Sequence, residues 1–163
     1  MPGGLLFAYQ RGMLNEGDKA PTFHLTSDAG KAVSLTDLKG KTVVLYFYPK
    51  ALTTGCTQQA CDFRDETPAF RKRKAVVLGV SADAVERLEK FRDKLELPFP
   101  LLSDEDKKVC KAYGVWQEKS MYGKKFMGIV RTTFVIGPDG KIAKIFSKVK
   151  IKDHVAQVLE SLP

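Results

Sequence analysis

The apolar and polar positions of this chain are organised around the stretch from Thr42 to Arg64. It opens with β-branched and aromatic residues up to Tyr48, without charge or alternation, a pattern typical of a strand buried on both faces. Pro49 ends this strand, and a short loop leads to Cys56. The apolar positions after the loop recur at helical spacing, at Ala60, Phe63, Thr67 and Phe70. The pattern therefore places Cys56 in the first turn of a helix, directly after the carboxyl end of a buried strand.

The rest of the chain is predicted to supply further strands and helices on both sides of this unit. The other expected strands are a hairpin in Thr22–Ser34, Ala75–Val80, Pro98–Leu102, and a second hairpin of Ile129–Ile136 with Ile142–Phe146. The expected helices are a single turn in Ser34–Gly40, a helix over Val85–Leu95 capped by Ser81 or Asp83, one from Ser103 to about Tyr113, and one over Val155–Leu162.

Trp116 to Gly128 is polar and aperiodic, and we interpret it as a loop with Met121 and Tyr122 near the site. Parallel units in the first half of the chain and an antiparallel hairpin in the second predict an α/β fold with a mixed central sheet flanked by helices. This order is that of a thioredoxin-like fold with an N-terminal β-hairpin extension and an inserted element.

The length of 163 residues suits one domain with its own core. We expect residues 15–163 to form this domain and residues 1–14 to form a flexible tail. The apolar patch at Leu5–Tyr9 lacks a charged leader and is too short for a signal peptide. No apolar run approaches the roughly 20 residues needed to span a bilayer, so no membrane association is expected.

The net charge of +8 raises the question of nucleic-acid binding, but the 27 basic residues are spread along the whole chain. The one dense cluster, Arg71–Lys74, lies where a helix is expected to end, a position that favours cations in any case. We therefore expect no nucleic-acid partner, only a mild attraction to acidic ones. Three cysteines are too few for a secreted disulfide framework and indicate a cytoplasmic thiol protein.

Cys56 is the leading candidate for chemistry. Free amide groups and the helix dipole favour an anion at the start of a helix, and the thiolate is the reactive form of cysteine. Thr53 and Thr54 place hydroxyl groups within one turn of it. The alternative is a buried structural thiol, an interpretation that suits Cys110 better because that residue lies among apolar positions of a predicted helix.

The two histidines are not expected to take part in a site. His24 alternates with apolar neighbours, and His154 begins the final helix, so we interpret both as surface residues. Three cysteines and two histidines show no ligand-pair spacing, which argues against a zinc centre.

At these positions the chain resembles a known family. The string YFYPKALTTGCTQQACDFRD carries Pro49, Thr53 and Cys56 at the spacing P-x-x-x-T-x-x-C, the peroxiredoxin signature. Cys61, SDEDKKVCKAYGVW, EKSMYGKKFMGI and RTTFVI are similar to the Q-type peroxiredoxins, also called bacterioferritin comigratory proteins. The resemblance covers the chain from about Asn15 to the C-terminus.

The resemblance implies a peroxidase that reduces hydrogen peroxide and organic hydroperoxides without metal or organic cofactor. Cys56 would be the peroxidatic cysteine, with Thr53 on the substrate oxygens and Pro49 shielding the pocket. Arg131 would orient and polarise the peroxide. Cys61 would resolve the Cys56 sulfenic acid as an intramolecular disulfide, and a thioredoxin-like reductant would recycle it. A monomer is expected.

Two physical arguments accompany the resemblance. Arg131 keeps its charge and presents a planar fork of donors, which suits stabilisation of the oxygens as the O–O bond breaks; a surface arginine is the alternative. Residues five apart on a helix, such as Cys56 and Cys61, have Cα atoms roughly 8–9 Å apart. A disulfide needs less than about 7 Å. We therefore expect the helix to unwind in each turnover.

One residue departs from the family pattern. Thr54 stands where the family usually has Pro before the Gly-Cys pair, a change that would loosen the loop or open Cys56 to solvent. The competing functions are a thioredoxin-type thiol–disulfide exchanger, which normally uses C-x-x-C, and a holdase-like or redox-sensing binding module that uses the exposed oxidised loop.

Overall fold

The computed structural model describes residues 13–163, so most of the predicted tail at residues 1–14 lies outside the described residues. The strands are β1 (His24–Ser27), β2 (Ala32–Ser34), β3 (Thr42–Phe47), β4 (Ala75–Ser81), β5 (Leu101–Ser103), β6 (Trp116–Met121), β7 (Lys124–Ile129), β8 (Thr132–Ile136) and β9 (Ile142–Phe146). The helices are the 3-10 helix η1 (Leu35–Leu38), α2 (Thr54–Asp65), α3 (Thr67–Lys72), α4 (Val85–Leu95), α5 (Lys108–Ala112) and α6 (His154–Glu160).

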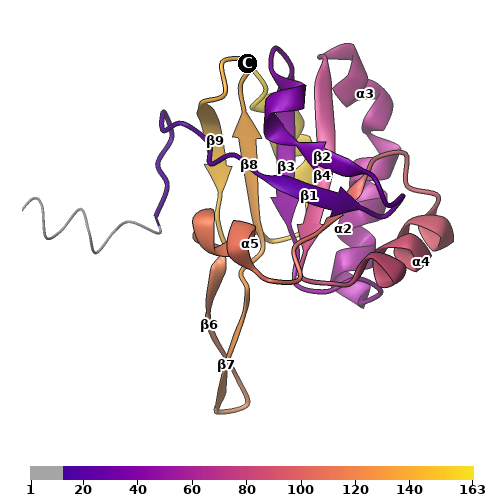
Figure 1. The fold of residues 1–163 in the computed structure, drawn as a ribbon, viewed down its shortest axis with the longest axis vertical. Coiled ribbons are helices and arrows are strands. Elements are labelled where there is room, and N and C mark those ends of the chain that lie inside the picture. The colour runs from indigo at the N-terminus through magenta and orange to yellow at the C-terminus, as the bar shows by residue number, and fades with distance from the viewer. Residues whose placement is uncertain (1–12) are drawn as a thin grey trace, which may run out of the picture.

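A mixed sheet of seven strands in the order β2-β1-β5-β4-β3-β8-β9 forms the middle of the molecule (Figure 1). β3, β4 and β5 run parallel, whereas β8 pairs antiparallel with β3, and β9 antiparallel with β8. β1 and β2 form the N-terminal hairpin, and β1 joins β5. The predicted α/β class, mixed sheet and N-terminal hairpin extension are confirmed.

β3 lies inside the sheet, between β4 and β8, and all its residues are buried. Its side chains alternate between two apolar cores, because successive side chains of a strand point to opposite faces. Val44 and Tyr46 join the core under α2, α3, α4 and α6. Val43 and Leu45 join the core on the other face, which η1 and α5 cover. This double burial explains why the strand has no polar alternation.

The predicted loop at Trp116–Gly128 is wrong. β6 and β7 pair antiparallel and form a separate two-stranded ribbon that extends away from the body of the molecule (Figure 1). Tyr122 and Gly123 turn the chain with φ angles of 52° and 78°, as in a two-residue hairpin turn. Met121 and Tyr122 are 58% and 98% exposed at this tip. The prediction that these two residues lie near the site is therefore wrong: they lie at the exposed tip of the ribbon (Figure 1).

The predicted surface position of His154 is also wrong. His154 is 2% exposed and begins α6 with its ring edge-on to Phe63 and Phe146. Its Nε2 forms a hydrogen bond of 2.8 Å with Thr133 Oγ1. This contact satisfies one ring nitrogen and allows the imidazole to be buried. His24, in contrast, is exposed as predicted.

Two helices begin at other residues, or with other caps, than the sequence predicts. The helix expected from Ser103 begins only at Lys108, because the carboxylate of Asp104 accepts from the backbone N–H groups of Val109 and Cys110 and caps it from outside. At α4 the N-cap position is Ala84, and no side chain caps it.

No helix within residues 13–163 combines the length and apolar character that a membrane crossing requires.

Candidate active site

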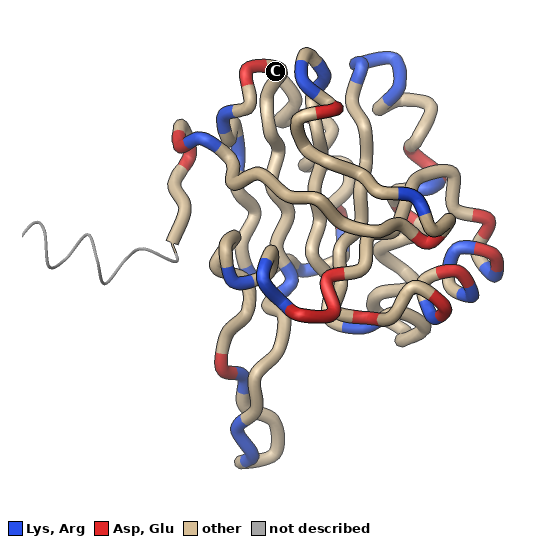
Figure 2. The backbone as a smooth tube through the Cα atoms, in the orientation of Figure 1, with Lys and Arg blue, Asp and Glu red and all other residues tan. Residues whose placement is uncertain are grey.

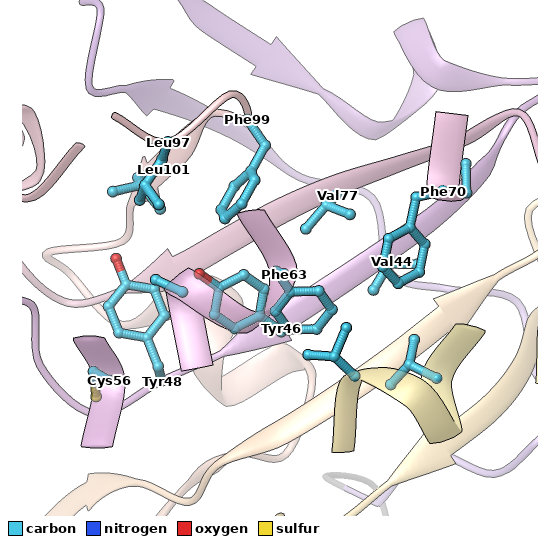
Figure 3. Packing of buried hydrophobic residues seen from close by; sticks show 14 of the residues in the cluster. Val44, Tyr46, Tyr48, Cys56, Phe63, Phe70, Val77, Leu97, Phe99 and Leu101 are labelled. Atoms are coloured by element: carbon cyan, nitrogen blue, oxygen red, sulfur yellow. The ribbon is translucent and has the colours of Figure 1, made fainter. Parts of the chain in front are cut away.

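Cys56 lies in the first turn of α2, as predicted, and is 2% exposed. Thr53 is the N-cap residue of this helix, and Thr54 is its first residue. Pro49 is half-buried just beyond the carboxyl end of β3 and separates that strand from the loop. In Figure 3 Cys56 lies on α2 beside Tyr48, at the edge of the apolar cluster. The sulfur is therefore at the boundary between the apolar core and the loop.

Arg131 reaches Cys56 from the start of β8. Since Thr132 pairs with Phe47 at the end of β3, the ladder places Arg131 beside the loop that follows β3. The guanidinium Nη2 donates to Cys56 Sγ at 3.3 Å. The side chain is half-buried, so the predicted inward orientation is confirmed and the surface alternative is wrong.

Gln59 is a site residue that the sequence analysis missed. It is 0% exposed, and its side-chain oxygen accepts a hydrogen bond from Arg131 Nη1. Cys56 and Gln59 share one face of α2, because residues three apart on a helix are neighbours. Only this spacing could have indicated it. Gln59 fixes the plane of the guanidinium, so that the other arm points at the sulfur.

The Thr53 side chain forms its hydrogen bond with the loop and not with Cys56. It is exposed, and its hydroxyl donates to the Lys50 carbonyl oxygen at 2.7 Å. A hydroxyl oxygen has two lone pairs, so with its hydrogen engaged it still accepts. The side chain can therefore receive a hydrogen bond from a hydroperoxide O–H group, while the contact with Lys50 holds the loop.

A second network holds this loop from behind, and the sequence analysis missed it as well. Asp83 Oδ2 accepts from the Ala51 N–H at 2.8 Å and from Ser81 Oγ at 2.7 Å. Arg87 Nη2 donates to the Ala51 carbonyl at 2.8 Å. Leu52 then takes a left-handed conformation with φ 65°. The sequence pattern assigned Asp83 to helix capping, but its carboxylate instead holds the chain in place ahead of Cys56.

Gly55 has a steric role beside the sulfur. A Cβ atom there would lie 3.2 Å from Ile151 Cδ1 and 3.5 Å from Arg131 Nη2. The Ile151 side chain thus covers this turn, and the segment that carries it is tied to the site because Val149 N–H donates to the Arg131 carbonyl at 3.0 Å. Ile151 forms an apolar wall that no motif in the sequence indicated.

Lys119 adds a second cation on the hairpin side. It is half-buried, and its Nζ donates to the Ile129 carbonyl at 2.9 Å. Burial lowers the pKa of Lys119, and the positive charge of Arg131 lowers it further. The two cationic side chains therefore lie within electrostatic reach of each other at the β7–β8 connection.

All three cysteines are free thiols. Cys61 is half-buried on α2, and the helix is continuous between it and Cys56. Cys110 is 0% exposed and belongs to the core on the opposite face of the sheet from Cys56. Burial raises the pKa of the Cys110 thiol, and the neighbouring Asp104 adds to the effect. The structural interpretation of Cys110 is therefore confirmed.

The arrangement supports two-electron thiol chemistry. A cysteine sulfur sits under an oriented guanidinium, in a setting of low polarity where a fixed donor stabilises developing charge strongly. Among residues 13–163, no group of three or more His, Cys, Asp or Glu side chains is placed to hold a metal ion.

Known proteins are similar in sequence over most of this chain. A model of the AhpC/TSA family matches residues 16–145. Peroxiredoxin Bcp of Bacillus subtilis is 50% identical over 146 residues, covering 90% of this chain and 93% of that protein. Peroxiredoxin Bcp of Escherichia coli K12 is 48% identical over 149 residues, covering 91% of this chain and 96% of that protein.

Solved structures agree with the sequence matches. One structure of Xanthomonas campestris peroxiredoxin Q has a TM-score of 0.82 at 40% identity and covers 85% of this chain and 88% of that chain. A mutant of PrxQ from Xylella fastidiosa has a TM-score of 0.86 at 37% identity and covers 90% and 94%. The chain therefore belongs to the AhpC/TSA family of thioredoxin-fold peroxiredoxins, in its Bcp or peroxiredoxin Q subfamily.

Proposed function

We propose that this chain is a thiol-dependent peroxidase in which Cys56 reduces hydrogen peroxide and organic hydroperoxides. The observation that carries the proposal is the contact of 3.3 Å from Arg131 Nη2 to Cys56 Sγ. The Bcp relatives support the reaction class, and the similar bacterioferritin comigratory protein of Xanthomonas campestris is described by its alkyl peroxide reduction activity.

In the first step, the Cys56 thiolate attacks one peroxide oxygen in line with the O–O bond. A sulfur–oxygen bond forms, the O–O bond breaks, and the second oxygen leaves with the electron pair and takes up a proton as water or alcohol. The sulfur is thereby oxidised to a sulfenic acid. Arg131 donates to the oxygens as charge develops, Thr53 accepts from the peroxide O–H, and Pro49 shields the pocket.

In the second step, the Cys61 thiolate attacks the sulfur of the sulfenic acid. A disulfide forms, and the oxygen leaves as water after protonation. Because α2 is continuous between the two residues, their Cα atoms lie roughly 8–9 Å apart, so α2 must unwind locally. A dithiol of the thioredoxin type then reduces the disulfide and returns both thiols.

The further properties of the protein are part of the same proposal. We infer a cytoplasmic monomer in which residues 15–163 act as one domain, without a nucleic-acid or membrane partner. Support comes from the site, which is built from a single chain, and from the charge distribution. Lys and Arg are scattered over the backbone, with acidic residues among them (Figure 2). Along residues 13–163 the pattern in Figure 2 does not gather into a continuous basic stripe of the kind that nucleic-acid binding uses.

The test is stopped-flow reduction of hydrogen peroxide by the pre-reduced protein, followed by peptide mapping of the product. We expect a fast reaction that Cys56→Ser abolishes, and a Cys56–Cys61 disulfide that Cys61→Ser abolishes. Cys110→Ser is the matched control and should react like the wild type. A rate no better than that of a free thiol would contradict the proposal, and faster oxidation of Cys56 by a protein disulfide would favour the thiol–disulfide exchanger.

A further inference from the structure

Tyr46 has a buried hydroxyl group without a hydrogen-bond partner. The residue lies on β3 beneath α2 and is 1% exposed. Its ring stacks on Phe63 of α2 with a centroid distance of 4.6 Å and meets Phe99 edge-on at 6.1 Å (Figure 3). Within the described part of the chain its hydroxyl oxygen contacts no donor or acceptor. Buried hydroxyls are normally paired, so this one calls for an explanation.

The Tyr46 ring is confined, so its hydroxyl cannot move to a partner. On the neighbouring strand β4 the ring lies against Gly79, where a Cβ atom would approach the Tyr46 Cζ to 2.9 Å. β4 and α2 therefore hold the ring from both sides. Besides burial and Tyr48, the sulfurs of Cys56 and Cys61 both raise the pKa of the Tyr46 phenol, so both lie within its electrostatic reach.

The cost of the unpaired hydroxyl depends on the state of α2. While α2 is folded, the hydroxyl is buried away from solvent and has no partner among the described residues, which destabilises this conformation. Once the helix unwinds, water can reach the phenol and complete its hydrogen bonds. The Tyr48 hydroxyl and Gln59 Nε2 are also buried without a partner among the described residues; the Gln59 atom lies on α2 itself and acts in the same direction.

We propose that Tyr46 sets the rate of the resolving step, because its unpaired hydroxyl keeps the folded form of α2 close in free energy to the unwound form. The inference rests on the proposed function, in which Cys61 reaches Cys56 only after α2 unwinds. Tyr46 touches neither substrate nor reacting atoms, so it is a positioning residue that acts through the helix.

Tyr46→Phe tests the inference, since it removes the hydroxyl and leaves the ring. In stopped-flow with hydrogen peroxide we expect sulfenic acid formation at the wild-type rate. Disulfide formation should be slower by on the order of ten-fold, the effect of one unpaired buried hydroxyl. The longer-lived sulfenic acid should also be oxidised further to sulfinic acid at lower peroxide concentration, measured by mass spectrometry.

Tyr113→Phe is the matched control. Tyr113 is 2% exposed in the opposite core, but its hydroxyl donates to the Pro21 carbonyl at 2.6 Å. Removing this paired hydroxyl should lower global stability and leave the resolving step unchanged. Hydrogen exchange of the reduced proteins adds a readout without peroxide. Amides of α2 should exchange more slowly in Tyr46→Phe relative to those of α4.

The outcomes distinguish failure of this inference from failure of the proposed function. A resolving step in Tyr46→Phe at or above the wild-type rate, or α2 exchange that changes only in parallel with α4, would overturn the inference. A wild-type protein that shows no fast first phase with peroxide would overturn the proposed function instead. In that case the hydrogen-exchange comparison still tests whether Tyr46 controls the opening of α2.

Discussion

Among single side chains, Arg131 has the most demanding position, because its guanidinium divides its donors between two residues of one helix. One arm donates to Gln59 Oε1 and the other to Cys56 Sγ. The first contact orients the group, and the second can turn to a peroxide oxygen when substrate enters. Charge alone would attract an anion, but the fixed plane aims a donor at the breaking bond.

Arg131→Lys keeps the charge and removes the planar fork. We expect the second-order rate constant with hydrogen peroxide to fall by on the order of 10²–10³, the usual effect of losing one preorganised donor. Stopped-flow measurement at neutral pH checks this value. A loss below about ten-fold would mean that positive charge, and not the geometry of the donors, accounts for the role of Arg131.

Gln59→Leu tests the orienting contact. The variant leaves Arg131 Nη1 without its acceptor, so we expect the peroxide rate to fall by about 10–100-fold, less than for removal of the guanidinium itself. Gln58→Leu is the matched control, because Gln58 is exposed on the same helix and its Nε2 donates to Asp62 Oδ1 at 2.8 Å, away from Arg131. Equal rates for the two variants would show that Gln59 has no part in positioning.

At the level of elements, α2 must adopt two different conformations during one catalytic cycle. It must be folded for Cys56 to meet Arg131, and it must unwind for Cys56 to meet Cys61. Thr54 occupies the first helical position, where proline is well tolerated because the N–H has no intrahelical partner. α2 begins at Thr54, but threonine does not fix the backbone φ angle as proline would. The start of the helix is therefore less constrained than with proline.

Thr54→Pro should stabilise the folded form of α2 by about 0.4–1 kcal/mol, since proline restricts the unwound chain. We expect slower disulfide formation and greater sulfinic acid formation, measured by stopped-flow and mass spectrometry. Thr54→Ala changes the side chain without restricting the backbone and serves as the control. Faster disulfide formation in the proline variant would contradict this account of the helix start.

For the molecule as a whole, His154 couples pH to stability. Burial, with a smaller effect of the Arg131 charge, lowers the pKa of His154 from its ordinary value of 6.5 to about 4. The folded state therefore disfavours the charged imidazole, and the unfolded state binds its proton more readily between these values. The stabilisation from the neutral ring is fully present above pH 6.5 and declines as pH falls towards 4.

His154→Gln should reduce the loss of stability between pH 7 and pH 4 by up to about 3 kcal/mol relative to the wild type. Urea unfolding at several pH values measures the difference, from which carboxylate titrations common to both proteins cancel. His24→Gln is the control, since His24 is exposed on β1. Identical pH profiles for all three proteins would contradict a neutral, buried His154.

The central sheet and the start of α2 could be predicted because burial on one or two faces leaves a strong pattern in the residues. The β6–β7 hairpin could not, since most of its residues are exposed and no apolar alternation marks either strand. Its register is set by local pairing and by the turn at Tyr122 and Gly123. Polar ribbons of this kind look like loops in a hydrophobicity pattern.

The candidate site divides in the same way. Cys56, Thr53 and Arg131 could be found because a motif and a strand pattern placed them. Gln59 and Asp83 could not, because each acts through a hydrogen-bond partner that lies far along the chain: Arg131 for Gln59 and Ala51 for Asp83. The burial of His154 likewise depends on Thr133, a contact between strand and helix that no local pattern encodes.

The sheet separates Cys110 from Cys56, so labelling of the Cys110 thiol can report complete unfolding of the protein. A thiol-labelling reagent can reach Cys56 and Cys61 whenever α2 opens, but it reaches Cys110 only when the opposite core dissolves. Counting labels on each molecule over time would therefore separate partial opening from full denaturation. The rarely modified third thiol would report the lifetime of the native fold during catalysis, without any added probe.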